Sequence, residues 1–230
     1  MRTLGVIPAR GGSKGVLRKN LRPLGGRPLL AWTAEAALGA SRLARVVLST
    51  DDEEIAAVGA RLGLDVPFRR PAELATDSAP AIPVIQHALS MVEDLEGECY
   101  DAVTMLQPTT PFRTSADLDG ALALLESSGA DSVISVVAVG GHHPARMKYL
   151  VGDRLIDPPF CEERENQPRQ ELREMFIRNG AIYATRAAVL RGDSFKGRDC
   201  RAWIMPVDRS VNIDTVEDFV RAEWMLERAG

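Results

Sequence analysis

The stretch "GVIPARGGSKGVLRKNL" at residues 5–21 shows how the fold begins. Its first residues continue an apolar run that predicts a buried strand at 3–7. Three glycines follow, at positions 11, 12 and 15, together with the cations Arg10, Lys14, Arg18 and Lys19. Glycines let backbone N–H groups approach an anion closely, and the cations add charge. The loop therefore predicts a phosphate site, with a surface turn of solvated cations as the alternative. The loop matches neither the Walker A pattern GxxxxGK[ST] nor the dinucleotide-binding pattern GxGxxG.

Strand and helix patterns alternate along the rest of the chain. Apolar runs predict strands at 3–7, 45–49, 102–106, 132–139, 181–185 and 202–207. Helices are expected at 28–40, after a cap at Thr50 or Asp51, at 82–95, from Thr114 to Gly129, and at 215–228. This alternation predicts an α/β fold with a mostly parallel sheet and helices on both faces. Ligands of such sheets bind beyond the carboxyl ends of the strands.

The alternation of strands and helices is interrupted at residues 141–178, which are rich in charge, proline and histidine. We expect one domain over 1–230, with 141–178 as an excursion from the sheet that forms a lid or a dimerisation arm. A short strand is also expected at 65–68.

Composition excludes several classes of protein. Hydrophobic residues make up 45% of the 230 residues, enough for a full core, and the net charge of -4 argues against general nucleic-acid binding. The three cysteines show no paired spacing, which favours a reducing compartment. No apolar stretch approaches the roughly 20 residues that span a bilayer. We expect a cytoplasmic protein without a membrane segment.

Eight segments together carry a resemblance to a known family. They are "IPARGGSKGVLRKNL" at 7–21, "STDDEEIA" at 49–56, "RRPAELATD" at 69–77, "LQPTTPFR" at 106–113, "HHP" at 142–144, "RQ" at 169–170, "IRNGAIY" at 177–183 and "IDTVEDF" at 213–219. In this order they resemble the CMP-sialic acid synthetases (acylneuraminate cytidylyltransferases), which make CMP-activated nonulosonic acids from CTP. The resemblance implies a three-layer Rossmann-like sandwich, an Mg²⁺ cofactor, and a homodimer whose excursion crosses to the partner.

The resemblance also implies a nucleotide site. The residues that it implies for CTP are Arg10, Gly11, Gly12, Ser13, Lys14, Asn20 and Arg70. Arg10 and Lys14 would act in catalysis by stabilising the triphosphate and the departing pyrophosphate. Arg70 would contact the cytosine side of CTP. On sequence alone, Arg69 and Arg70 are equally well explained as a solvated surface pair.

For the acid-sugar acceptor, the resemblance implies Gln107, Arg146, Arg169 and Gln170. Arg169 would bind the carboxylate of the sugar through a bidentate pair, and through the excursion it could serve the other subunit's site. Without the resemblance, Gln107 could belong to a capped turn, and the 169–178 stretch could be a salt-bridged exposed face.

The magnesium ligands would come from "NID" at 212–214. Asp214 would hold Mg²⁺ against the CTP phosphates and so take part in catalysis, with Asn212 as a neutral second ligand. The structural alternative is that Asp214 or Thr215 caps the last helix. Relatives commonly carry Asp-x-Asp here, so Asn212 is a departure. The alternatives are a cytidylyltransferase for legionaminic, pseudaminic or 3-deoxy-octulosonic acid, and a non-catalytic CTP-binding protein.

Overall fold

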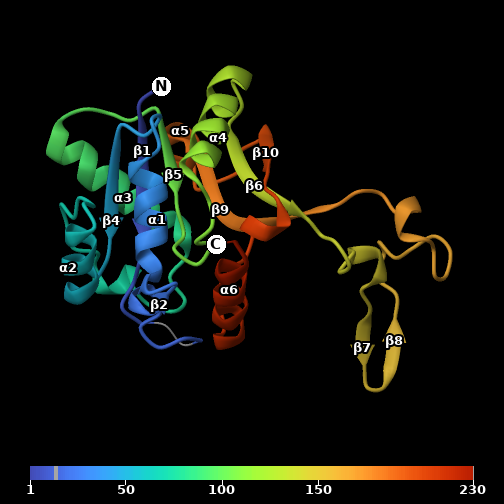
Figure 1. Ribbon diagram of the computed structural model, residues 1–230. Coiled ribbons are helices and arrows are strands. Elements are labelled where there is room, and N and C mark those ends of the chain that lie inside the picture. Colours follow the sequence, from blue (N-terminus) through green and yellow to red (C-terminus); the bar gives the residue numbers. More distant parts are fainter. Residues whose placement is uncertain (13–14, 230) are drawn as a thin grey trace.

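The computed structural model describes residues 1–12 and 15–229, and it is built around a six-stranded sheet in the order β10-β6-β9-β5-β1-β4 (Figure 1). The strands of this sheet are β1 (Thr3–Pro8), β4 (Arg45–Ser49), β5 (Ala102–Met105), β6 (Ser132–Ala138), β9 (Phe176–Arg186) and β10 (Cys200–Ile204). β1 pairs in parallel with both β4 and β5, and β10 pairs in parallel with β6. Only β9 among the described strands of this sheet is antiparallel to its neighbours, β5 and β6. The predicted mostly parallel sheet is confirmed, with β9 as an unexpected antiparallel insertion.

Helices cover both faces of the sheet, as predicted. The described helices are α1 (Leu29–Leu38), α2 (Glu53–Arg61), α3 (Ala81–Glu96), α4 (Ser115–Ser128), α5 (Ala187–Arg191) and α6 (Val216–Ala229). Side chains of α1, α2 and α4 share one buried apolar cluster with the sheet, and those of α3 and α5 share another. Along β1 the side chains alternate between these layers: Val6 belongs to the second cluster and Ile7 to the first. The three-layer α/β sandwich is confirmed.

Two expectations about local structure are wrong. The helix that follows β4 is capped neither by Thr50 nor by Asp51 but by Asp52, whose carboxylate accepts a hydrogen bond from the N–H of Ile55. Residues 65–68 form no strand, because only Asp65 makes an isolated bridge, to Val47. At Thr114, by contrast, the predicted reciprocal capping box with Asp117 is present.

The last helix, α6, lies at the carboxyl end of the sheet (Figure 1). Phe219 and Ala222 of α6 pack with Leu24 of the short hairpin formed by β2 (Pro23–Leu24) and β3 (Arg27–Pro28), and with Val211 and Ile213. This third cluster places the 211–214 segment beside the loop that follows β1.

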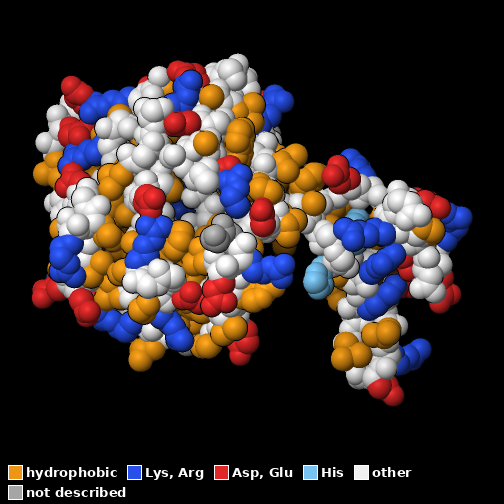
Figure 2. All heavy atoms as spheres, viewed as in Figure 1, with side chains coloured by type: hydrophobic (Ala, Val, Ile, Leu, Met, Phe, Trp, Pro, Cys, Tyr) orange, Lys and Arg blue, Asp and Glu red, His pale blue; other side chains and the backbone are white. Residues whose placement is uncertain are grey.

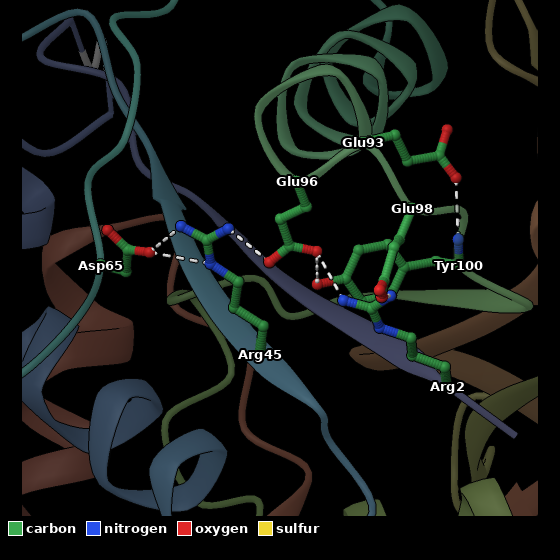
Figure 3. Close-up of polar contacts among 7 residues, drawn as sticks. All are labelled: Arg2, Arg45, Asp65, Glu93, Glu96, Glu98 and Tyr100. Atoms are coloured by element: carbon green, nitrogen blue, oxygen red, sulfur yellow. Dashed lines mark hydrogen bonds and ion pairs between the residues drawn. The ribbon is translucent and has the colours of Figure 1, made fainter.

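An ion-pair network ties the opposite, amino end of the sheet together (Figure 3). Glu96, at the end of α3, accepts hydrogen bonds from Arg45 at 2.6 Å, from Arg2 at 2.7 Å and from the Tyr100 hydroxyl at 2.9 Å. Arg45 also bonds Asp65. The network lies away from the carboxyl ends of the strands, so its role is to hold α3 and two strand starts together.

The excursion leaves the sheet between β6 and β9 and projects from the body as an arm (Figure 1). At its tip β7 (Tyr149–Val151) and β8 (Arg154–Ile156) form an antiparallel hairpin. Its exposed apolar side chains include Leu150 at 70% and Leu155 at 73% exposure. No helix of the described residues combines the length and the apolar character needed to cross a membrane.

Candidate active site

A cavity of about 280 Å³ opens at the carboxyl ends of β1 and β5. Its apolar lining comes largely from α3 and the segment before it: Leu74, Ala79, Ala81, Val84, Ile85 and Met105. Its polar lining consists of Arg10, Lys19, Asn20, Arg70, Thr76, Asp77, Gln107 and Thr109. The backbone of Gly12 also lines it. The structure therefore brings together five of the predicted site residues, Arg10, Gly12, Asn20, Arg70 and Gln107, in one cavity.

The loop after β1 is shaped by contacts to acidic residues. The N–H of Gly11 donates to Asp51 at 3.0 Å, and Gly11 does not line the cavity. The side-chain amide of Asn20 donates to the carbonyl of Arg10 at 3.0 Å, so Asn20 supports the loop from within. Arg10 forms an ion pair with Asp77 across the cavity mouth at 2.7 Å. Ser13 and Lys14 lie outside the described residues.

Arg70 is buried at the base of the cavity, with 5% of its surface exposed. Its Nε donates to the hydroxyl of Ser49 at 3.1 Å, and one Nη donates to the carbonyl of the same residue. Burial lowers the pKa of Arg70 to about 10, so the guanidinium stays charged at neutral pH. Arg69 points the other way and pairs with Glu53 on the surface.

In the sequence Lys19 is one of four cations in the loop after β1, and in the structure it joins this loop to the 211–214 segment. Its Nζ donates to the carbonyl of Ile213 at 2.8 Å and to Asp214 at 3.1 Å. The side-chain amide of Asn212 donates to the other oxygen of Asp214. Asp214 itself is 63% exposed in its side chain and lies at the rim, one ion pair away from the cavity wall.

Gln107 and Asn212 approach each other around Gly180. The position that a Cβ of Gly180 would occupy lies 3.0 Å from Oε1 of Gln107 and 3.8 Å from Oδ1 of Asn212. Gly180 has a φ of +81°, in the region that favours glycine. The N–H of Ile213 donates to the carbonyl of Thr109 at 2.7 Å, which fixes the 211–214 segment against the turn after β5.

The remaining predicted acceptor residues do not join this cavity. Arg146, Arg169 and Gln170 all lie on the arm, where Arg146 donates to the carbonyl of Gln167 at 2.9 Å. Figure 2 shows Lys and Arg side chains gathered on the arm, separated from the body in this view. Within one chain the structure therefore divides the predicted acceptor residues between the cavity and the arm.

The donor set at 212–214 fits a magnesium ion only with help from a ligand. Among residues 1–12 and 15–229, no group of three or more His, Cys, Asp and Glu side chains is arranged to hold a metal. Asp214 offers one carboxylate and Asn212 one amide oxygen, and Mg²⁺ commonly completes such a partial set with phosphate oxygens and water. In the structure both carboxylate oxygens of Asp214 accept hydrogen bonds, from Lys19 and from Asn212. The role of these two residues in binding Mg²⁺ stays a prediction.

Comparison with known proteins agrees with this geometry. The family model of the cytidylyltransferases matches residues 4–151. The chain belongs to the cytidylyltransferase family. It is 33% identical to the CMP-N,N'-diacetyllegionaminic acid synthase of Legionella pneumophila, over 99% of this chain and 97% of that protein. It is also 36% identical to the N-acylneuraminate cytidylyltransferase of Escherichia coli O18:K1:H7, over 95% of this chain but only 51% of that longer protein.

The resemblance to the CMP-sialic acid synthetases is thereby confirmed, and this cytidylyltransferase is an enzyme of their type. Its fold matches a solved CMP:2-keto-3-deoxy-manno-octonic acid synthetase complexed with CTP, with a TM-score of 0.74 over the full length of both chains at 18% identity. That match supports the predicted three-layer Rossmann-like fold.

Proposed function

We propose that this cytidylyltransferase transfers CMP from CTP to the anomeric hydroxyl of a sialic-type nonulosonic acid and releases pyrophosphate. The observation that carries the proposal is the cavity, whose lining combines the cations Arg10, Lys19 and Arg70, apolar side chains of α3, and Gln107 in the turn after β5. A triphosphate suits the cations and a planar base suits the apolar side chains.

The reaction is an in-line displacement. The anomeric oxygen of the sugar forms a bond to the α-phosphorus of CTP, the bond from that phosphorus to the bridging oxygen breaks, and pyrophosphate leaves with the electron pair. The proton of the hydroxyl is released. Catalysis of such a step depends on positioning and on neutralising charge. Arg10 and Lys19 would neutralise the phosphates, and Gln107 would orient the sugar.

Mg²⁺ is part of the proposal. When bound, it would supply positive charge to the phosphates and Lewis acidity to the attacking hydroxyl. Asp214 and Asn212 are the residues that would hold it. Lys19 sits between these residues and the cavity, so the same lysine can contact the phosphates and Asp214.

We also propose a homodimer in which the arm of one subunit supplies Arg146, Arg169 and Gln170 to its partner's cavity. The support is their place on the arm, outside the cavity of their own chain, and the exposed apolar side chains of the arm. The three cysteines are free thiols, which fits the cytoplasm, where we expect the enzyme to meet CTP.

Mixing two inactive variants tests the arm. Arg10→Met disables the cavity, and Arg169→Met disables the arm. If the arm serves the partner, a mixed dimer regains one intact site, so activity should return towards a quarter of the wild-type level. If the arm serves its own chain, the mixture stays inactive.

Pyrophosphate release tests the reaction itself. With CTP and Mg²⁺, we expect release in the presence of N-acetylneuraminate, legionaminate or pseudaminate, and little with 3-deoxy-octulosonate. ATP and GTP should not replace CTP. Measurable CTP binding without release for any of the four sugars would contradict the proposal.

A further inference from the structure

Arg113 is a buried cation without an acidic partner. Only 3% of its surface is exposed. Its Nε donates to the carbonyl of Ala181 at 2.8 Å, one Nη donates to the hydroxyl of Thr33 at 2.7 Å, and the other Nη donates to the carbonyl of Gln107. No ion pair joins Arg113 to a carboxylate among the described residues. The charge of Asp117 acts on it, but the carboxylate of Asp117 is paired with Arg209.

Burying the charge of Arg113 in this way lowers the stability of the folded protein. A buried charge that is not paired loses its hydration, and the penalty is several kcal/mol per ion even after relaxation. Burial accordingly lowers the pKa of Arg113 to about 9. An apolar side chain of similar size would fill the same volume without this penalty. Packing alone therefore does not explain why a guanidinium stands here.

The three partners of Arg113 show what it does. Gln107 lies two residues after the end of β5, Ala181 lies on β9, and Thr33 lies on α1. Gly180, next to Ala181, is the residue whose Cβ position is 3.0 Å from the side-chain oxygen of Gln107. The rigid fork of the guanidinium thus links the turn after β5 to β9 and to α1.

We propose that Arg113 is a positioning residue of the acceptor subsite, which holds the side chain of Gln107 in register with Gly180 by binding the carbonyls of Gln107 and Ala181. This inference rests on the proposed function, in which Gln107 orients the acid sugar. Among the described residues, the hydrogen bonds of Arg113 go to Ala181, Thr33 and Gln107, not to Arg10, Arg70 or α3. Its loss should therefore affect the sugar and not CTP.

The first test is Arg113→Lys, which keeps a cation but cannot bind three acceptors in a fork. We expect the KM for the acid sugar to rise about ten-fold, the size of one lost charged hydrogen bond, while the KM for CTP changes less than about two-fold. Arg186→Lys is the matched control, because Arg186 also bonds backbone carbonyls, those of Ala130 and Leu125, at the far end of β9. An unchanged sugar KM, or equal rises in both KM values, would overturn the inference.

A double-mutant cycle separates positioning from general stability. If Arg113 acts through Gln107, then adding Arg113→Lys to a Gln107→Ala variant should raise the sugar KM less than about two-fold further. A full ten-fold additional rise in that background would show that Arg113 acts by another route. Should Arg113→Lys fail to fold, Thr33→Val removes only one acceptor, and we expect the same selective effect at about three-fold.

A readout without turnover keeps this inference distinct from the proposed function. In ¹H–¹⁵N spectra, the side-chain amide of Gln107 should shift in Arg113→Lys and remain in place in Arg186→Lys. Wild-type protein that releases no pyrophosphate with any sugar contradicts the proposed function alone. An unmoved Gln107 resonance contradicts the positioning role, whatever the activity.

Discussion

Lys19 and Asp214 lie 195 residues apart in the sequence and form an ion pair of 3.1 Å at the rim of the cavity. The pair joins the loop after β1 to the segment before α6, and a second bond from Lys19 to the carbonyl of Ile213 strengthens the link. Gly15 lies against the same segment, since a Cβ there would meet the carbonyl oxygen of Asp214 at 2.3 Å. The loop after β1 and the proposed magnesium ligands therefore form one unit.

Removing the charge of Lys19 should disable this unit. We expect Lys19→Met to lower kcat on the order of 10²-fold, as loss of a preorganised donor to developing charge does. Lys196→Met, which removes an exposed lysine in the loop before β10, should change kcat less than about two-fold. Steady-state kinetics at saturating Mg²⁺ checks this. Equal kcat values for Lys19→Met and the wild type would exclude Lys19 from the reaction.

Asn212→Asp should strengthen metal binding. The substitution replaces an amide that donates to Asp214 with a second carboxylate, so two negative charges would face the ion. We expect the Mg²⁺ concentration for half-maximal activity to fall several-fold, and the melting temperature without Mg²⁺ to fall because the carboxylates repel each other. The melting temperature should recover when Mg²⁺ and CTP are added. If neither quantity changes, Asn212 has no part in the metal site.

Gly180→Ala should lower the stability of the protein and weaken sugar binding, and these two effects have separable causes. Its positive φ disfavours alanine, and the added Cβ would meet Gln107 at 3.0 Å. Gly152→Ala in the β7–β8 turn, with a φ of +64° and nothing within 4 Å, isolates the first cost. We expect about 1 kcal/mol of lost stability for each from the backbone, measured by urea unfolding. Only Gly180→Ala should also raise the KM for the acid sugar; the same rise in Gly152→Ala would mean that the contact with Gln107 is not the cause.

His87 should make the protein less stable in acid. Its Nδ1 is buried and has no hydrogen-bond partner among the described residues, and the ring packs edge-on against Phe68 at 5.3 Å between centroids. Burial lowers the pKa of His87, and the charge of Arg70 lowers it further. Below the unfolded pKa of about 6.5 the unfolded chain therefore binds more protons, so stability is lost as the pH falls from there towards the folded pKa.

His87→Gln removes this contribution. Between pH 7.5 and pH 5 the wild type should lose more unfolding free energy than the variant does. His142→Gln, which changes an exposed histidine on the arm, should follow the wild-type curve. Parallel curves for the wild type and His87→Gln would mean that His87 titrates equally in both states.

The alternation of strands and helices could be predicted from the sequence because each element carries its own local signal. The run before Pro8 is apolar, and Thr114 and Asp117 have the spacing of a capping box. The antiparallel insertion of β9 between β5 and β6 carries no such signal. It depends on pairs such as Val103 with Thr185, which form only in the folded chain.

Within the site, residues of one type divide into opposite roles that local pattern does not separate. Arg18 pairs with Asp52 and Glu54, while its neighbour Lys19 turns towards Asp214. In the sequence nothing distinguishes Arg113 from another arginine near the start of a helix. In the structure it is buried between α1, β9 and the turn after β5. The partners of these cations lie far away in the sequence. Local pattern therefore cannot show which cation is buried, which lies on the surface and which lines the cavity.

The fate of the α-phosphorus of CTP tests the central claim most directly. With CTP labelled at the α-phosphate, Mg²⁺ and the preferred acid sugar, we predict that all released pyrophosphate is unlabelled and that the label appears in a phosphodiester to the sugar. Label in the pyrophosphate fraction, or label left only in CTP while CTP binds, would contradict CMP transfer by this chain.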